Sequence, residues 1–166
     1  MLKLVKESLN EFGKGQDPMS TLNIGGKIEM KKFMQDIEVP DDDYIIKDNI
    51  VWFKQSVVLL SHLDLTIFPY NLYVSNHLYM IRCKNLSQLP EEITVELNMY
   101  LRECDNLSQL PNKLKVGGDL YIIDCIKLYT IPETADIRGD IIVTRYQQKL
   151  IKFLENSKFA NQFKIH

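Results

Sequence analysis

Three cysteines are the residues of this sequence whose type and spacing first point to chemistry. Cys83, Cys104 and Cys125 are separated by equal intervals of 21 residues. A thiolate is a nucleophile and a soft metal ligand, so regularly spaced thiols raise the questions of covalent catalysis and of metal binding. An odd number suits neither a closed disulfide framework nor a four-ligand zinc site. The equal spacing instead indicates that all three occupy one position of a repeated unit.

The histidines do not complete a catalytic set. His62 lies 21 residues before Cys83 and shares its place in the repeat, His77 stands alone, and His166 is the last residue. A catalytic thiolate needs an exposed position beside a base or cation, whereas a repeated turn position predicts buried thiols. The three aspartates at 41–43 lack the further spaced oxygens of a calcium loop. We expect no enzymatic activity, no cofactor and no metal, and we favour a packing ladder of thiols over a three-thiol metal site.

The 21-residue period extends beyond the cysteines and defines the repeated unit. Apolar pairs, a leucine, a proline and a valine recur at this spacing, the first clear repeat begins near Ser56, and residues 41–50 are irregular and predicted to form a cap. The recurring positions are Leu78/Met80, Met99/Leu101, Leu120/Ile122 and Ile141/Val143; Leu86, Leu107 and Leu128; Pro69, Pro90, Pro111 and Pro132; and Val74, Val95, Val116 and Ile137.

Each unit is predicted to contain a short strand followed by a turn. Alternation at Leu78, Tyr79 and Met80 sends the first and third side chains to the core and the second outward. The cysteine after the strand is small enough for an inward turn, and its weak S–H can donate to a turn carbonyl. Proline ends the strand side and begins a turn. Since one repeat cannot bury its own apolar face, neighbouring repeats must stack.

The repeated segments LYMIRCKNLSQLP, MYLRECDNLSQLP and LYIIDCIKLYTIP resemble leucine-rich repeats of the short bacterial or viral type, in which Leu-Pro closes the strand-to-turn segment. The resemblance covers roughly residues 56 to 145. It departs from the usual form because the next leucine follows the cysteine by three residues rather than two. The resemblance implies an α/β-repeat solenoid with short parallel strands that works by binding. Similar repeats form the recognition part of secreted bacterial ubiquitin ligases, but only about 20 residues follow the last repeat, so no ligase activity is expected.

The flanks are predicted to seal the array at 41–146. Residues 1–40 are expected to form an N-terminal helical cap with apolar stripes at Leu2, Val5, Leu9 and Phe12 and at Met30, Phe33, Met34 and Ile37. Residues 147–166 are expected to form a C-terminal capping helix, because Leu150, Ile151, Phe153, Leu154 and Phe159 recur with helical spacing.

The opening segment MLKLVKESLNEFGKGQDPMSTLNIG resembles the start of phage-encoded proteins of varied function. The resemblance implies an alternative function, a phage-associated structural or accessory protein recruited through its N-terminal segment. Alternatively, the segment is a plain N-terminal helix that covers the first repeat.

The outward strand positions supply the candidate binding site. Tyr79, Tyr100 and Tyr121 fall on adjacent strands, which lie about 4.8 Å apart in a sheet, so they are expected to form a stripe. Tyrosine combines a large contact area with a polar tip and suits interfaces. A margin of mixed charge favours a protein or peptide partner, and carbohydrate remains possible. The flanking candidate residues are His77, Asn98, Arg82 and Arg102.

The tyrosine stripe is also compatible with two roles that need no partner. Cross-strand aromatic pairs stabilise a sheet whether or not anything binds to them. Alternatively, the chain's own flanks cover the stripe.

Composition limits the remaining function classes. The chain has 166 residues, of which 45% are hydrophobic and 25% charged, as in an ordinary globular domain. A formal net charge of −2 and the lack of a basic cluster disfavour nucleic acid. No apolar run reaches the roughly 18 residues of a membrane span, and no signal peptide is recognisable. We therefore expect a cytoplasmic protein, located in the host cytoplasm or the virion if it is phage-encoded.

Overall fold

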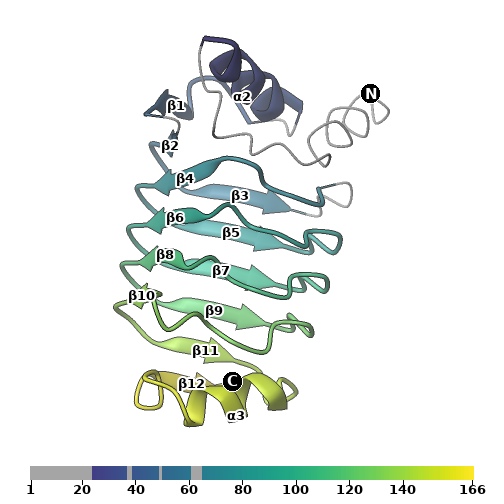
Figure 1. Ribbon diagram of the computed structural model, residues 1–166, viewed down its shortest axis with the longest axis vertical. Coiled ribbons are helices and arrows are strands. Elements are labelled where there is room, and N and C mark those ends of the chain that lie inside the picture. The colour runs from purple at the N-terminus through teal and green to yellow at the C-terminus, as the bar shows by residue number, and fades with distance from the viewer. Residues whose placement is uncertain (1–23, 37–38, 49, 61–64) are drawn as a thin grey trace.

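Two β-sheets run side by side along the repeat region and form a parallel β-solenoid (Figure 1). The computed structural model describes residues 24–36, 39–48, 50–60 and 65–166. Sheet 1 contains, in order, β1 (Tyr44–Lys47), β2 (Ile50–Phe53), β4 (Asn71–Val74), β6 (Glu92–Val95), β8 (Lys113–Val116) and β10 (Asp136–Ile137). Sheet 2 contains β3 (Val57–Leu60), β5 (Leu78–Ile81), β7 (Met99–Arg102), β9 (Leu120–Ile123), β11 (Ile141–Val143) and β12 (Phe163–Ile165).

The sequence period sets the register of both sheets. Tyr79 pairs with Tyr100, and Tyr100 with Tyr121, so equivalent residues of successive turns stack in columns. All neighbouring strands are parallel except β1 and β2, which form the irregular start of sheet 1. The expected solenoid of short parallel strands is thus present.

Each turn carries a second strand that the sequence analysis did not identify. The valine column at Val74, Val95 and Val116 closes strands β4, β6 and β8 of sheet 1. These strands alternate between buried and half-buried or exposed positions, as β-strands with one covered face do. The chain then crosses to sheet 2 through a tight return. At Gly117 a Cβ atom would lie 2.1 Å from the carbonyl oxygen of Glu96, so this return has no room for a side chain.

The core lies between the two sheets and includes the cysteine column. Cys83, Cys104 and Cys125 are reduced thiols and are 0% exposed. The Sγ of Cys104 donates to the carbonyl oxygen of Met80 at 3.4 Å, and that of Cys83 to the carbonyl oxygen of Leu59 at 3.5 Å. The predicted ladder of buried, reduced thiols that bond to backbone carbonyls is therefore confirmed.

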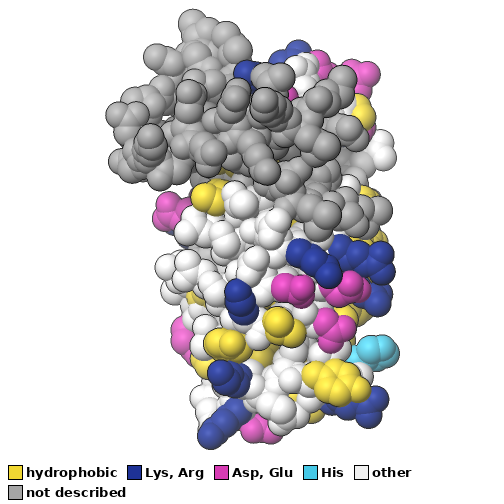
Figure 2. Space-filling view, turned by 90° about the vertical axis from the view of Figure 1, so that its right-hand side faces the viewer, with side chains coloured by type: hydrophobic (Ala, Val, Ile, Leu, Met, Phe, Trp, Pro, Cys, Tyr) yellow, Lys and Arg dark blue, Asp and Glu magenta, His cyan; other side chains and the backbone are white. Residues whose placement is uncertain are grey.

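The turn into the cysteine column uses a left-handed backbone. Arg82, Glu103 and Asp124, each directly before a cysteine, have φ of 58°, 54° and 56°. This conformation is uncommon for residues with a side chain. Its recurrence at one position of three turns shows that the path of the chain around each turn requires the left-handed conformation. The loops that follow this position form the side of the molecule seen in Figure 2.

Helix α2 (Ile24–Asp36) lies at the N-terminal end of the solenoid (Figure 1). Met30, Phe33 and Met34 are buried, as their predicted apolar stripe requires. The ring of Phe33 meets those of Phe68 and Tyr70 edge-on at centroid distances of 5.3 and 5.4 Å. Ile37 and the first predicted stripe, residues 2–12, lie outside the described residues, as does most of the segment with the phage resemblance. An N-terminal helical cap over 1–40 therefore stays a prediction.

Helix α3 (Gln148–Glu155) lies at the opposite end and is shorter than predicted. Leu150, Ile151 and Leu154 are buried against the core. The side chains of Asn156 and Ser157 bond to the carbonyl oxygens of Lys152 and Leu154, which satisfies groups that end a helix. The prediction of one helix over 147–166 was wrong, because the chain turns after Glu155 and adds β12 to sheet 2 beside β11.

Within the described ranges, no helix has both the length and the apolar character needed to cross a lipid bilayer.

Candidate binding surface on sheet 2

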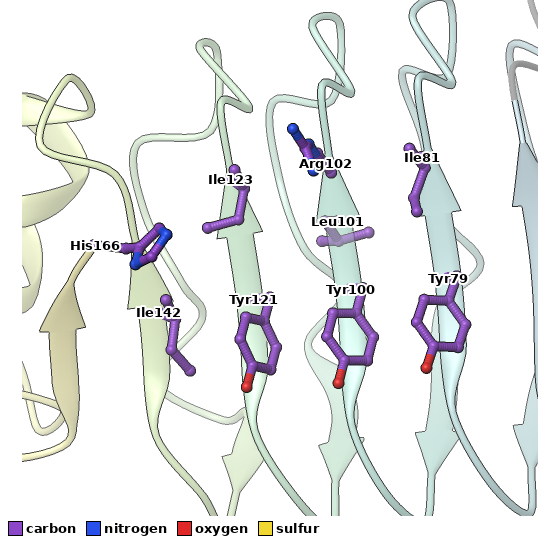
Figure 3. Close-up of a pocket in the computed structure, with 9 residues that line it drawn as sticks. All are labelled: Tyr79, Ile81, Tyr100, Leu101, Arg102, Tyr121, Ile123, Ile142 and His166. Atoms are coloured by element: carbon purple, nitrogen blue, oxygen red, sulfur yellow. The ribbon is translucent and has the colours of Figure 1, made fainter.

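The tyrosines of adjacent turns form a continuous stack on the outer face of sheet 2. The rings of Tyr79 and Tyr100 have centroids 4.5 Å apart and planes inclined by 4°. Those of Tyr100 and Tyr121 are 4.4 Å apart and inclined by 16°. Figure 3 shows the three rings in a row with their hydroxyl groups pointing the same way. The stripe expected from the sequence is thus formed, with Tyr100 between its two neighbours.

The stack lies outside the core because the strands alternate. In β5, β7 and β9 the residues on either side of each tyrosine are buried, and the tyrosines are half-buried. Leu78 and Met80, for example, are both 0% exposed. The side chains that face the solvent can therefore change without emptying the core, and the fold leaves this face free for another role.

A second outward column runs beside the tyrosines and encloses a shallow cavity with them. The cavity has a volume of about 340 Å³. Ile81, Arg102 and Ile123 form the column on the far side of the cavity from the tyrosine hydroxyl groups (Figure 3). Ile142 and His166 line the end of the cavity towards β12, and Leu101 contributes as well. Most of these side chains are apolar, and Arg102 and His166 add polar groups at the margin.

His77 and Asn98 hold neighbouring turns together at the edge of the stack. The Nδ1 atom of His77 accepts the N–H of Asn98 at 3.1 Å, and Asn98 Oδ1 accepts the N–H of Asp119 at 2.9 Å. Asp119 Oδ1 continues the ladder by accepting the N–H of Asp140 at 2.8 Å. Both predicted site residues therefore have a structural task, and neither lines the cavity.

The same ladder orients the hydroxyl groups of Tyr100 and Tyr121. The amide of Asn98 donates to the hydroxyl oxygen of Tyr100 at 3.1 Å, and the hydroxyl of Tyr121 donates to Asp119 Oδ2 at 3.4 Å. Partial burial and the negative charge of Asp119 raise the pKa of Tyr121, so this phenol remains a neutral donor.

The two arginines predicted to belong to the site, Arg82 and Arg102, both form ion pairs with Glu103. Arg82 Nε and Arg102 Nε each lie 3.2 Å from a carboxylate oxygen of Glu103. Their side chains are 60% and 57% exposed, so these ion pairs contribute little to stability. Arg102 lines the cavity, whereas Arg82 lies in the turn beyond Ile81 and does not.

Five residues that line the cavity were not among the predicted site residues: Ile81, Leu101, Ile123, Ile142 and His166. His166 reaches the cavity because β12 extends sheet 2 by one strand, with Lys164 opposite Ile142. Helix α3 interrupts the 21-residue period before that strand, so no repeat position pointed to it.

The cysteine column offers no reactive thiolate at Cys104. Hydrogen bonding with Cys125 and burial outweigh the opposing hydrogen bond with Cys83 and raise the pKa of Cys104 to about 12. A neutral buried thiol is a poor nucleophile and a poor metal ligand. Among the described residues no group of three or more His, Cys, Asp or Glu side chains is placed to hold a metal ion.

No protein-family model, curated protein or solved structure matches the chain in comparisons with known proteins.

Proposed function

We propose that this chain is a non-enzymatic binding module that recognises a protein or peptide through the outer face of sheet 2. The observation that carries the proposal is the cavity of about 340 Å³ between the tyrosine stack and the column of Ile81, Arg102 and Ile123. Aromatic and aliphatic anchors around a pocket, with charged groups at the rim, are typical of interface centres. The resemblance to leucine-rich repeats supports the proposal, since repeat solenoids bind partners along continuous faces.

Stabilisation of the sheet would explain the tyrosine stack but not the second outward column beside it. Stacked tyrosines strengthen neighbouring strands in the absence of a partner. That role does not require the second outward column, in which Ile81 and Ile123 stay half-buried. The tyrosine stack and the isoleucines on either side of Arg102 leave a mainly apolar surface exposed, and such surfaces mark interaction sites.

The ring geometry favours a polypeptide over a carbohydrate. Tyr100 has both ring faces against other tyrosines, at 4.5 and 4.4 Å. Stacking on a sugar requires an open ring face, and the stack leaves mainly ring edges and hydroxyl groups for contact. Edges beside isoleucines suit the apolar and aromatic side chains of a protein partner.

Affinity capture from the native lysate with three matched baits tests the proposal. The first bait is the unaltered chain, and the second carries Tyr79→Thr, Tyr100→Thr and Tyr121→Thr, which replace each tyrosine with another residue of high β-propensity. The third carries Thr94→Ala and Lys115→Ala on the outer face of sheet 1. We expect the second bait alone to lose the captured partner. Equal recovery by all three baits, with all three shown to be folded by circular dichroism, would refute binding through sheet 2.

A further inference from the structure

The last full turn of the solenoid departs from the repeat in one loop. The loops after sheet 2 read CKNLS at 83–87 and CDNLS at 104–108, but CIKLY at 125–129. All three close with the same backbone hydrogen bond, from the N–H of Leu86, Leu107 and Leu128 to the carbonyl of the cysteine three residues earlier. The backbone is thus shared, and the fold does not require the different side chains of the third loop.

These departures place large apolar side chains in the solvent. Ile126 is 63% exposed where the earlier turns have Lys84 and Asp105, and Tyr129 is 42% exposed where they have serine. Tyr146, which is 76% exposed, lies one period after Cys125, at the position where buried cysteines recur. Solvent-exposed apolar groups gain nothing for folding, so their concentration here indicates a role other than stability.

The three side chains surround a second cavity, which is separate from the one on sheet 2. Its volume is about 310 Å³, and Leu128 and Leu150 also line it. The cavity lies between the third loop and the start of α3. Figure 2 views this side of the molecule, and its lower half shows hydrophobic side chains among side chains of both charges. We call this surface, lined by Ile126, Tyr129, Tyr146 and Lys149, the loop–helix patch.

The loop–helix patch is bordered by positive charge. Lys149 Nζ lies 4.5 Å from the ring centroid of Tyr129, and the Arg145 guanidinium lies 5.4 Å from that of Tyr146. Lys127, where the earlier turns have Asn85 and Asn106, donates from Nζ to Asn106 Oδ1 of the preceding turn at 2.6 Å and does not line the cavity. The carboxylate that lines the cavity, Asp124, accepts a hydrogen bond from the Thr144 hydroxyl at 3.0 Å. Two cations, Arg145 and Lys149, beside one carboxylate that is already hydrogen-bonded leave the border of the cavity positive.

We propose that the loop–helix patch binds an acidic peptide segment, with one apolar side chain of the peptide in the cavity and its carboxylates on Arg145 and Lys149. An apolar cavity with a charged rim matches such a segment in both shape and sign. This site is independent of the proposed binding surface on sheet 2, because none of its lining residues belongs to the first cavity.

A single-stranded nucleic acid fits the patch less well. Base stacking requires open aromatic faces, and here Lys149 and Arg145 lie over Tyr129 and Tyr146. The aliphatic Ile126, which is exposed and lines the cavity, offers no stacking surface. The formal net charge of −2 adds no long-range attraction for phosphates.

The repeat itself supplies the variant that tests the proposal. Ile126→Asp, Lys127→Asn and Tyr129→Ser together install the loop of the preceding turn, which the same backbone already accommodates. A random peptide library displayed on messenger RNA is selected against the full chain and counter-selected against this loop-graft variant. We expect enriched peptides that combine one large apolar residue with neighbouring Asp or Glu. Their affinity, measured by fluorescence anisotropy, should fall about tenfold or more in the variant.

Three controls make the result decisive. Thermal unfolding establishes that the loop-graft variant is folded, and the Tyr79/Tyr100/Tyr121 variant should bind the enriched peptides as the parent does. Lys149→Gln should weaken binding and reduce its dependence on salt. The proposal is overturned if no peptide is enriched over the counter-selection, if the enriched peptides lack acidic residues, or if oligothymidylate binds the parent chain more tightly than they do.

Discussion

At the scale of the residue, the repeat stacks identical side chains on one another. The contribution of each tyrosine to stability depends on how many other tyrosines it stacks on. Tyr100 stacks on two tyrosines, whereas Tyr79 stacks on one of them. The His77 ring is nearly equidistant from both, at 5.9 Å from Tyr79 and 6.0 Å from Tyr100. The two tyrosines therefore differ in their stacking and in the hydrogen bond that Asn98 donates to the Tyr100 hydroxyl.

Replacing the central tyrosine should cost more stability than replacing a terminal one. An aromatic pair contributes about 0.5–1.5 kcal/mol beyond area burial. Tyr100→Ala loses two such pairs and Tyr79→Ala loses one, so urea unfolding should show the Tyr100 variant to be less stable by about one pair energy. Tyr100→Phe retains the ring and should lose much less than Tyr100→Ala. Equal losses for the two alanine variants would show that the stack contributes no pairwise energy.

The buried thiol of Cys104 predicts a loss of stability in alkaline solution. Its pKa is raised from 9.0 to about 12 in the folded chain, so the unfolded chain ionises first as pH rises. The stabilising contribution is complete below pH 9 and is lost between pH 9 and about 12. In Cys104→Ser, whose hydroxyl does not ionise in this range, the free energy of unfolding should fall less steeply over the same interval. Parallel pH profiles for parent and variant would contradict the assignment.

At the scale of the element, β12 shows how the solenoid ends without another repeat. The N–H of His166 donates to the Val143 carbonyl, and the N–H of Ile141 donates to the Gln162 carbonyl, both at 2.8 Å. With Lys164 opposite Ile142, this parallel pattern directs the N–H of Lys164 to β11 and that of Ile165 away from it. Consecutive residues of one short strand therefore differ in whether their N–H is used.

Proline substitution should distinguish the two sides of β12. Lys164→Pro removes a donor to β11 and leaves a carbonyl without its partner, which costs on the order of 1 kcal/mol or more. Ile165→Pro removes an N–H that makes no bond to β11 and should cost less. Lys164→Ala corrects for loss of the side chain and its ion pair with Asp140. Chemical denaturation gives the ranking, and an Ile165→Pro variant that is the less stable of the two prolines would reverse the strand orientation inferred here.

At the scale of the whole molecule, the sequence predicted the repeated tyrosine and cysteine columns but missed one repeated strand and the segment that breaks the repeat. The 21-residue period and the alternation around Tyr79 were sufficient to predict a solenoid, the tyrosine column and the buried cysteines. The second strand of each turn was missed because the repeat was interpreted through a family resemblance that implies a strand followed by a turn. The strand β12 and the position of His166 follow a helix that breaks the period, so only tertiary pairing with β11 determines them.

Duplication of one turn provides the final test of this architecture. In a solenoid each turn contacts only its neighbours, so stability is approximately a sum over turns and the interfaces between them. Inserting a second copy of residues 92–112 before Lys113 preserves the pairing of Glu92 with Lys113 and adds a fourth tyrosine to the stack. We expect a folded chain with a larger dependence of unfolding free energy on urea, because more surface is buried. The same insert lacking Thr94 moves Val95 to the outer face and should destabilise the chain. If both inserts behave alike, the stacked columns do not determine the register, and the stability of the solenoid must come from its flanks.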